Sequence, residues 1–168
     1  LLVGKNSTLR RVQVLTMTLQ GVLVGDASVL EGVDARSCTS DGITVTNDCV
    51  LTRCNVSGTS SNGFLGTSRN TFVECISAKN IGGSGFAVMD SNVFETCRSD
   101  ENVGDGFTES SSIAAKSTGV YEASESGFMA ASAAVSPFVQ RQRRPSRAQT
   151  AATVALPACS VGRQRMGR

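Results

Sequence analysis

The chain has 168 residues, a formal net charge of +2 and 40% hydrophobic residues. This length is enough for one globular domain, and the hydrophobic content is ordinary for one. It contains no histidine, which excludes serine-histidine-aspartate and cysteine-histidine catalysis. No long apolar run of the kind that spans a bilayer occurs, so no membrane span is expected.

Glycines recur along most of the chain at a nearly constant interval. They are Gly21, Gly42, Gly63, Gly85, Gly106 and Gly127, separated by 21, 21, 22, 21 and 21 residues. An interval this regular is typical of repeat proteins, in which each repeat packs only against its neighbours. The sequence therefore predicts a stack of about six similar coils.

Apolar residues keep fixed places within each coil. Counted from the glycine as position 0, they fall at positions 1 and 3, 8 and 9, and 12 and 14, and Asn, Ser, Asp and Gly fill the intervals. This spacing predicts short strands joined by turns rather than helices. Stacked coils would pair these strands in parallel at about 4.8 Å around a dry core. The expected fold is all-β, a single-stranded parallel β-helix with a 21-residue repeat and an irregular C-terminal tail.

Two consecutive coils carry a motif that resembles a known family. The motif is Asn-x-Phe-x-x-Cys-x-Ser-x-x-Asn followed by Gly-Phe, and it starts at Asn70 and again at Asn92. It is similar to the right-handed parallel β-helix repeats of the pectate-lyase-like superfamily. The resemblance covers residues 1–136 and implies a right-handed coil. It implies no single activity, because the superfamily includes polysaccharide lyases, glycosidases, phage tailspikes, adhesins and inert surface proteins.

The first two coils, residues 1–41, begin in the middle of a repeat. Leu1 occupies position 1 of a coil, whereas the end of a solenoid usually carries a polar cap, so we expect a fragment of a longer protein. A processed mature terminus is the alternative. Asn6-Ser7-Thr8 and Asn55-Val56-Ser57 match the N-glycosylation pattern, which arises often by chance in turns rich in Asn and Ser.

Coils three to five, residues 42–105, are the most regular. The extra residue of the coil from Gly63 falls in the turn at 81–84, so the core positions should stay in register. Three cysteines share position 12 of their coils: Cys54, Cys75 and Cys97. Stacked reduced thiols are expected there, because parallel side chains point alike and rarely reach the torsion of a disulfide. The other cysteines fall at unrelated positions: Cys38, Cys49 and Cys159.

Neither a metal site nor a cofactor is expected. The chain has no Cys-x-x-Cys pair and no histidine, so the usual zinc ligand sets are missing.

The repeat decays in the sixth coil, residues 106–126. Ala115 and Thr118 replace large residues, and Glu109 falls at a position that points inward in other coils. The β-helix domain is therefore expected to span residues 1–136. Residues 137–168 hold seven arginines and no acid, so this tail carries +7 and the solenoid 9 − 14 = −5. We expect a disordered tail. A basic arm that binds nucleic acid or another anion is the alternative, which steep salt dependence would support.

The best candidate for a ligand-binding patch consists of four residues: Asp100, Glu101, Tyr121 and Glu122. Position 16 stacks Glu101 below Glu122, and position 15 places Asp100 below Tyr121. The two glutamates would lie about 5 Å apart at the backbone, in the range of a retaining glycosidase pair. Tyr121 offers a face for a sugar ring. A solvated turn neutralised by Lys79 and Arg98 is the plainer interpretation, and no catalytic residue is assigned.

Three kinds of function remain open. The preferred one is a non-catalytic segment of a surface, adhesin or tail-fibre-like protein, extracellular or on a particle surface, that binds polysaccharide or cell-surface glycan. One tyrosine, no tryptophan and no acidic cluster across coils favour it over a fragment of a polysaccharide lyase or glycoside hydrolase acting through carboxylates. Nucleic acid is not the expected partner. Uncapped coils also predict end-to-end self-association.

Overall fold

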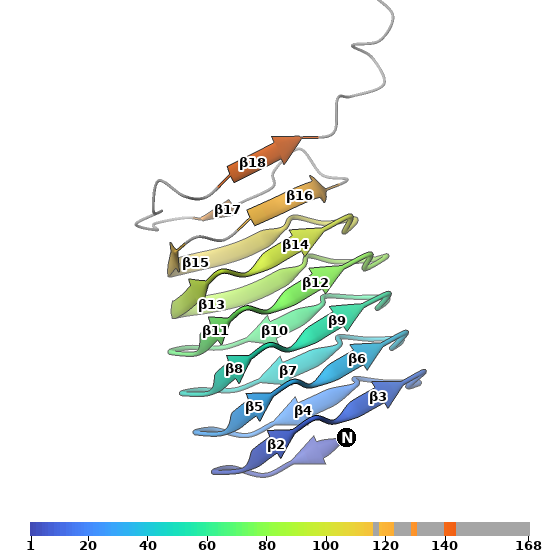
Figure 1. The fold of residues 1–168 in the computed structure, drawn as a ribbon, viewed down its shortest axis with the longest axis vertical. Coiled ribbons are helices and arrows are strands. Elements are labelled where there is room, and N and C mark those ends of the chain that lie inside the picture. Colours follow the sequence, from blue (N-terminus) through green and yellow to red (C-terminus); the bar gives the residue numbers. More distant parts are fainter. Residues whose placement is uncertain (116–117, 123–128, 131–139, 144–168) are drawn as a thin grey trace, which may run out of the picture.

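The computed structural model describes residues 1–115, 118–122, 129–130 and 140–143, with the side chains of residues 1–108. The chain winds into a stack of coils whose first strands lie at one end of the rod (Figure 1). Every strand pairs in parallel with its counterparts in the neighbouring coils. The structure therefore confirms the predicted right-handed parallel β-helix, with about five turns rather than six, and no helix occurs in these residues.

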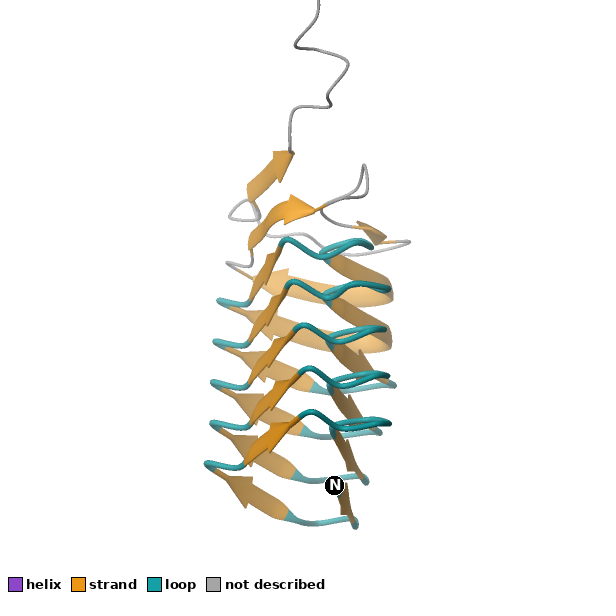
Figure 2. Cartoon of the chain, turned by 90° about the vertical axis from the view of Figure 1, so that its right-hand side faces the viewer, coloured by secondary structure: helices purple, strands orange, loops and turns teal. Residues whose placement is uncertain are grey.

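Three ladders of strands run along the rod, one for each side of the coil (Figure 2). The first ladder consists of β1 (Leu2–Val3), β4 (Val22–Val24), β7 (Ile43–Val45), β10 (Phe64–Gly66), β13 (Phe86–Glu95), β15 (Phe107–Ala115) and β17 (Met129–Ala130). The second ladder consists of β2 (Thr8–Arg10), β5 (Val29–Glu31), β8 (Val50–Thr52), β11 (Thr71–Val73) and the later parts of β13 and β15. The third ladder consists of β3 (Gln13–Leu15), β6 (Asp34–Arg36), β9 (Asn55–Ser57), β12 (Ile76–Ala78), β14 (Arg98–Asp100), β16 (Thr118–Glu122) and β18 (Gln140–Arg143).

The third ladder continues past residue 136, where the sequence predicts the domain to end. Strand β18 pairs with β16, with Thr118 opposite Gln140 and Gly119 opposite Arg141. Residues 144–168, which hold most of the predicted basic tail, lie outside the described part of the chain.

Each coil turns three corners, and the residue at each corner has a left-handed backbone. Examples from successive corners are Arg69, Glu74 and Lys79, with φ of 59°, 52° and 58°. This conformation turns the N–H of the corner residue toward the next coil, so that the N–H of Glu74 donates to the carbonyl of Glu95 at 2.9 Å. A non-glycine residue in this conformation costs about 1 kcal/mol or more, which the ladder of hydrogen bonds offsets.

The repeated glycine marks a close approach rather than an unusual backbone angle. A Cβ on Gly63 would collide with Ser77 Oγ, and a Cβ on Gly85 would collide with Ser99 Oγ. Each glycine therefore lets the first ladder begin directly against the inward side chain of the third ladder.

The core is a set of columns in which like side chains lie one coil apart. Phe86 stacks on Phe64 at 4.7 Å and on Phe107 at 4.8 Å between ring centroids, with an interplanar angle of 2° in both pairs. These distances equal the strand spacing of a sheet, so the rings stack with the same spacing as the coils. Phe72 and Phe94 form a second stack at 4.9 Å, edge-on to the first.

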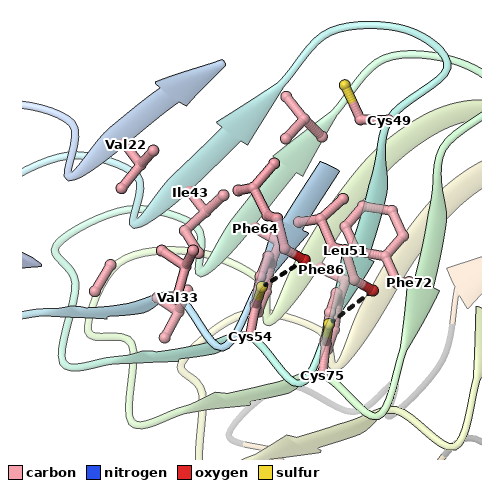
Figure 3. Packing of buried hydrophobic residues seen from close by; sticks show 14 of the residues in the cluster. Val22, Val33, Ile43, Cys49, Leu51, Cys54, Phe64, Phe72, Cys75 and Phe86 are labelled. Carbon is pink, nitrogen blue, oxygen red and sulfur yellow. Dashed lines mark hydrogen bonds between the residues drawn. The ribbon is translucent and has the colours of Figure 1, made fainter. Parts of the chain in front are cut away.

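The position-12 cysteines lie inside this core as free thiols, as the sequence predicts (Figure 3). Cys54 Sγ donates to the carbonyl of Leu30 at 3.7 Å, and Cys75 Sγ donates to that of Leu51 at 3.6 Å. A hydrogen bond with Cys75 and burial raise the pKa of Cys54, and burial is the main cause of the raised pKa of Cys75. Protonated thiols therefore fill the core as small apolar groups.

Cys38 and Cys49 are also buried, which corrects their assignment to unrelated positions. They belong to two inward columns at the turns, which are Ser28, Cys49, Asn70 and Asn92, and Cys38, Thr59, Asn80 and Asn102. Asn70 Oδ1 accepts the N–H of Cys49 at 2.9 Å, and Asn92 Oδ1 accepts the N–H of Asn70 at 2.9 Å. The asparagines therefore satisfy backbone donors inside the turns, where water does not reach.

Candidate functional site

Asp100 and Glu101 are the half of the predicted patch whose side chains the structure describes. Asp100 ends β14, and its Oδ2 accepts a hydrogen bond from Arg98 Nη2 at 2.6 Å, with the carboxylate side chain 18% exposed. Its Oδ1 is enclosed and has no hydrogen-bond partner among the described residues. Glu101 occupies a corner with φ of 53°, and its Oε2 lies 4.0 Å from Lys79 Nζ. Each acid thus has a cation beside it, as in the plainer interpretation of this turn.

The predicted stacking of the patch is wrong by one residue. Asp100 lies opposite Val120 rather than Tyr121. The cause lies at the first corner of the coil that carries Tyr121, where one residue separates Ser111 from Ile113, whereas two separate their partners Asp90 and Val93. Counting from the glycine does not detect a residue lost inside the coil. The side chains of Tyr121 and Glu122 lie outside the described ones, so their part in the patch stays a prediction.

A row of polar side chains runs along the outside of the first corner, which lies between the first and second ladders. Lys5 Nζ lies 2.7 Å from Asp26 Oδ2, Asn47 Nδ2 donates to Asp26 Oδ1 at 3.2 Å, and Thr67 Oγ1 donates to Asn47 Oδ1 at 2.9 Å. The hydrogen bond from Lys5 is the main reason that the pKa of Asp26 lies well below its usual value. This row ties four coils together, and its carboxylate is already occupied by donors.

A second polar row lies where the third ladder returns to the first. Asp41 is 7% exposed, and its Oδ1 accepts from both the backbone N–H and Nδ2 of Asn62, each at 3.0 Å. Asn62 Oδ1 in turn accepts the N–H of Ser84 at 3.0 Å. Side-chain oxygens here stand in for backbone partners, which is a structural use of aspartate and asparagine in turns.

An arginine cluster occupies the second corner, between the second and third ladders, of the first three coils. Arg10 and Arg53 contact the carboxylate of Glu31, and the backbone N–H of Arg11 donates to the carbonyl of Glu31. Glu31 Oε2 lies 3.3 Å from Arg10 Nε, and Glu31 Oε1 lies 2.6 Å from Arg53 Nη2. The guanidinium side chains of Arg10 and Arg53 are 69% and 58% exposed. Between Arg11 and Arg53 the same corner is occupied by Gly32, whose missing Cβ would meet only Arg11 Cγ, at 3.9 Å. The sequence signal for this cluster is the column of Arg11, Gly32 and Arg53 at position 11. The pattern of paired acids in the sequence does not include it.

Two glutamates lie next to each other higher on the same corner. The N–H of Glu74 donates to the carbonyl of Glu95 at 2.9 Å, and both side chains are exposed. Glu74 is at position 11 of its coil and Glu95 is at position 10 of the next coil. Stacking by equal positions therefore does not predict that they are neighbours.

The metal-ligating side chains of the described residues do not converge on one point. Within them, no group of three histidine, cysteine or acidic side chains is arranged to hold a metal ion. Likewise, that part of the chain has no helix with the length and apolar character needed to cross a membrane.

Comparisons with known proteins agree with this architecture. The family model described as "Right handed beta helix region" matches residues 3–139. No curated protein matches the sequence. Among solved structures, a double mutant of the periplasmic alginate epimerase AlgG is similar, with a TM-score of 0.51 and 11% identity. The match covers 83% of this chain and 47% of the epimerase, so the chain spans about half the length of that protein.

Proposed function

Because the chain belongs to the right-handed β-helix family, we propose that it is a non-catalytic segment of a surface, adhesin or tail-fibre-like protein whose long faces bind glycan. The observation that carries this proposal is the pairing of the acids in the predicted patch. Asp100 is held by Arg98 at 2.6 Å and Glu101 faces Lys79 at 4.0 Å. A general acid or a nucleophile needs a carboxylate that is available to the substrate.

Other acids of the described coils serve as links between coils. Asp26 is bound by Lys5, Glu31 by two arginines, and Asp48 by both Nε and Nη2 of Arg69, each at 2.7 Å. Such pairs join side chains about 21 residues apart in the sequence. They connect neighbouring coils along the outside of the rod, which suits a protein that presents an extended surface.

Polysaccharides are the first ligands to test. The similar solved structure is named as an alginate epimerase and as periplasmic, which supports a polysaccharide ligand and an extracellular or surface location for this chain. We expect retention of the purified chain on at least one glycan of an array of neutral and acidic polysaccharides. Absence of retention on all of them would contradict the proposal.

The second candidate is a fragment of a polysaccharide lyase or glycoside hydrolase. It is favoured by two exposed glutamates of adjacent coils, Glu74 and Glu95, whose backbones are hydrogen-bonded. Incubation with the same polysaccharides, followed by mass spectrometry of released oligosaccharides, separates the two candidates. New products that vanish in Glu74→Gln or Glu95→Gln, or in Glu101→Gln or Glu122→Gln, would establish an enzyme and locate its site. Retention without products is the result expected of a binding segment.

A further inference from the structure

We propose that the arginine cluster at the second corner is an anion-binding site that selects acidic polysaccharides by their carboxylate or sulfate groups. This inference rests on the proposed glycan-binding function and assigns a place and a ligand class to it. The cluster lies on the corner between the second and third ladders, away from the predicted patch around Asp100 and Glu101.

The cluster has a net positive charge. It holds three arginines, Arg10, Arg11 and Arg53, and one acid, Glu31, so the cluster carries 3 − 1 = +2. Asp34, the acid on the adjoining third ladder, is engaged by Arg36 at 2.6 Å and accepts from Asn55 Nδ2 at 3.2 Å. The excess positive charge of the corner is therefore not cancelled by this neighbour.

Glu31 lies between two of the arginines. Glu31 uses one oxygen for Arg10 and the other for Arg53, so one carboxylate orients two guanidinium groups from coils on either side of it. A guanidinium has five N–H donors, and these contacts leave most of them facing solvent. Arginine groups fixed in this way lose less entropy when they bind an anion, and they suit the paired oxygens of carboxylate and sulfate.

The corner is open between Arg11 and Arg53. The corner residues Arg11, Gly32 and Arg53 belong to consecutive coils, because β2, β5 and β8 pair in register immediately before them. Arg11 and Arg53 are therefore about 10 Å apart along the rod, two strand spacings. The glycine between them leaves an open notch in which a Cβ would meet only Arg11 Cγ. An anionic group seated in the notch would lie between the two corner arginines.

The same corner carries different residues further along the rod. In the next coils the same corner carries Glu74 and Thr96, and Glu95 lies beside Glu74. The corner thus changes from basic to acidic along the rod axis. A linear polyanion would be attracted at coils one to three and repelled beyond them, so its binding would be confined to the end of the rod that carries the N-terminus.

The test compares two double variants whose substitutions are alike. Arg11→Gly with Arg53→Gly removes two cations from corners with φ of 53° and 52°, where glycine adopts the backbone without strain. The matched control is Arg69→Gly with Lys79→Gly, which removes two cations from other corners with φ of 59° and 58°. Binding is measured to dextran sulfate, polygalacturonate and uncharged dextran, at several salt concentrations.

We expect the wild-type chain to bind the two acidic polymers more tightly than dextran, with affinity that falls as salt rises. The Arg11/Arg53 variant should lose about tenfold or more of that affinity, and the Arg69/Lys79 variant should keep most of it. A preference for one acidic polymer would identify sulfate or carboxylate as the group bound. Equal loss in both double variants, or no loss in the first, would overturn the inference while leaving glycan binding intact. Failure of the wild-type chain to bind any glycan, here or in the wider array, would instead overturn the proposed function itself.

Discussion

Replacement of Asn80 by aspartate should destabilise the β-helix in a pH-dependent way. Asn80 is fully buried, its Nδ2 donates to Asn102 Oδ1 at 2.7 Å and to Ser77 Oγ at 2.8 Å, and its Oδ1 accepts from Thr59. An aspartate of the same shape keeps the acceptor but places an oxygen where the donor was. When ionised it is a buried charge without a cation, which costs about 3–5 kcal/mol.

Protonation should recover most of this loss. A neutral carboxyl group can donate one of the two hydrogen bonds that the amide donated, which reduces the penalty to about 1 kcal/mol. A difference of about 3 kcal/mol corresponds to roughly two pKa units, so the folded carboxyl should have a pKa near 6 against about 4 when unfolded. Because the folded pKa is the higher one, the penalty is smallest below about pH 4 and grows as the pH rises toward about 6.

Equilibrium unfolding in urea, followed by circular dichroism at about pH 4 and pH 7, measures the difference between wild type and variant at each pH. Asn6→Asp is the matched control, because Asn6 is an exposed corner residue and a surface substitution of this kind should stay within about 0.5 kcal/mol at both values. An Asn80→Asp penalty that is equal at the two pH values, or larger at the acidic one, would refute the assignment of Asn80 as a buried donor.

Four further predictions concern the core and the corners. Phe86→Ala should cost about 4 kcal/mol in chemical unfolding, because its ring stacks on others at 4.7 and 4.8 Å; a cost under about 1 kcal/mol would contradict the stacked column. Thr96→Gly, at a φ of 54°, should stabilise by about 0.5–1 kcal/mol, and a lower melting temperature would contradict the corner conformation. Cys75, whose pKa is raised by burial, should react with iodoacetamide only in denaturant, as counted by mass spectrometry; labelling in native buffer would contradict its burial. Asp26, whose pKa is lowered chiefly by Lys5, should stabilise the fold above about pH 4 and lose this effect as the pH falls. In Asp26→Asn the free energy of unfolding should therefore decrease less between about pH 4 and lower pH than in the wild type. An unchanged decrease would contradict the contact.

The fold could be predicted because core positions of a solenoid repeat in the sequence. Phe64, Phe86 and Phe107 recur at position 1, and the structure buries all three in one column. The extra residue near 81–84 was also placed correctly, since Ser57 pairs with Ala78 before it and Phe64 with Phe86 after it, one residue out of step. Period and hydrophobicity suffice for such predictions because they reflect burial directly.

The corners could not be predicted in the same way. Arg69, Glu74 and Lys79 adopt a left-handed backbone that the sequence gives no reason to expect, because the stacked ladders impose it against the local preference of each residue. The register beyond Asp90 was missed for a related reason, since a corner accepts one residue more or less without disturbing the strands. The stacking within the candidate patch could not be predicted because it depends on that register. The arginine cluster could not be predicted from equal positions because it combines positions 10 and 11 of the coil.

The hydrogen bonds between coils join residues that are 20 to 25 positions apart in the sequence, for example Leu1 with Gly21 and Asn92 with Thr67. Each coil therefore needs only the coil before it as a template, and it does not wait for distant parts of the chain. Once a first pair of coils has formed, growth of the rod can proceed in one direction at the rate at which chain becomes available. A polypeptide built in this way can fold while it emerges from a ribosome or a translocation pore, and the energy released as each coil docks opposes backsliding of the chain.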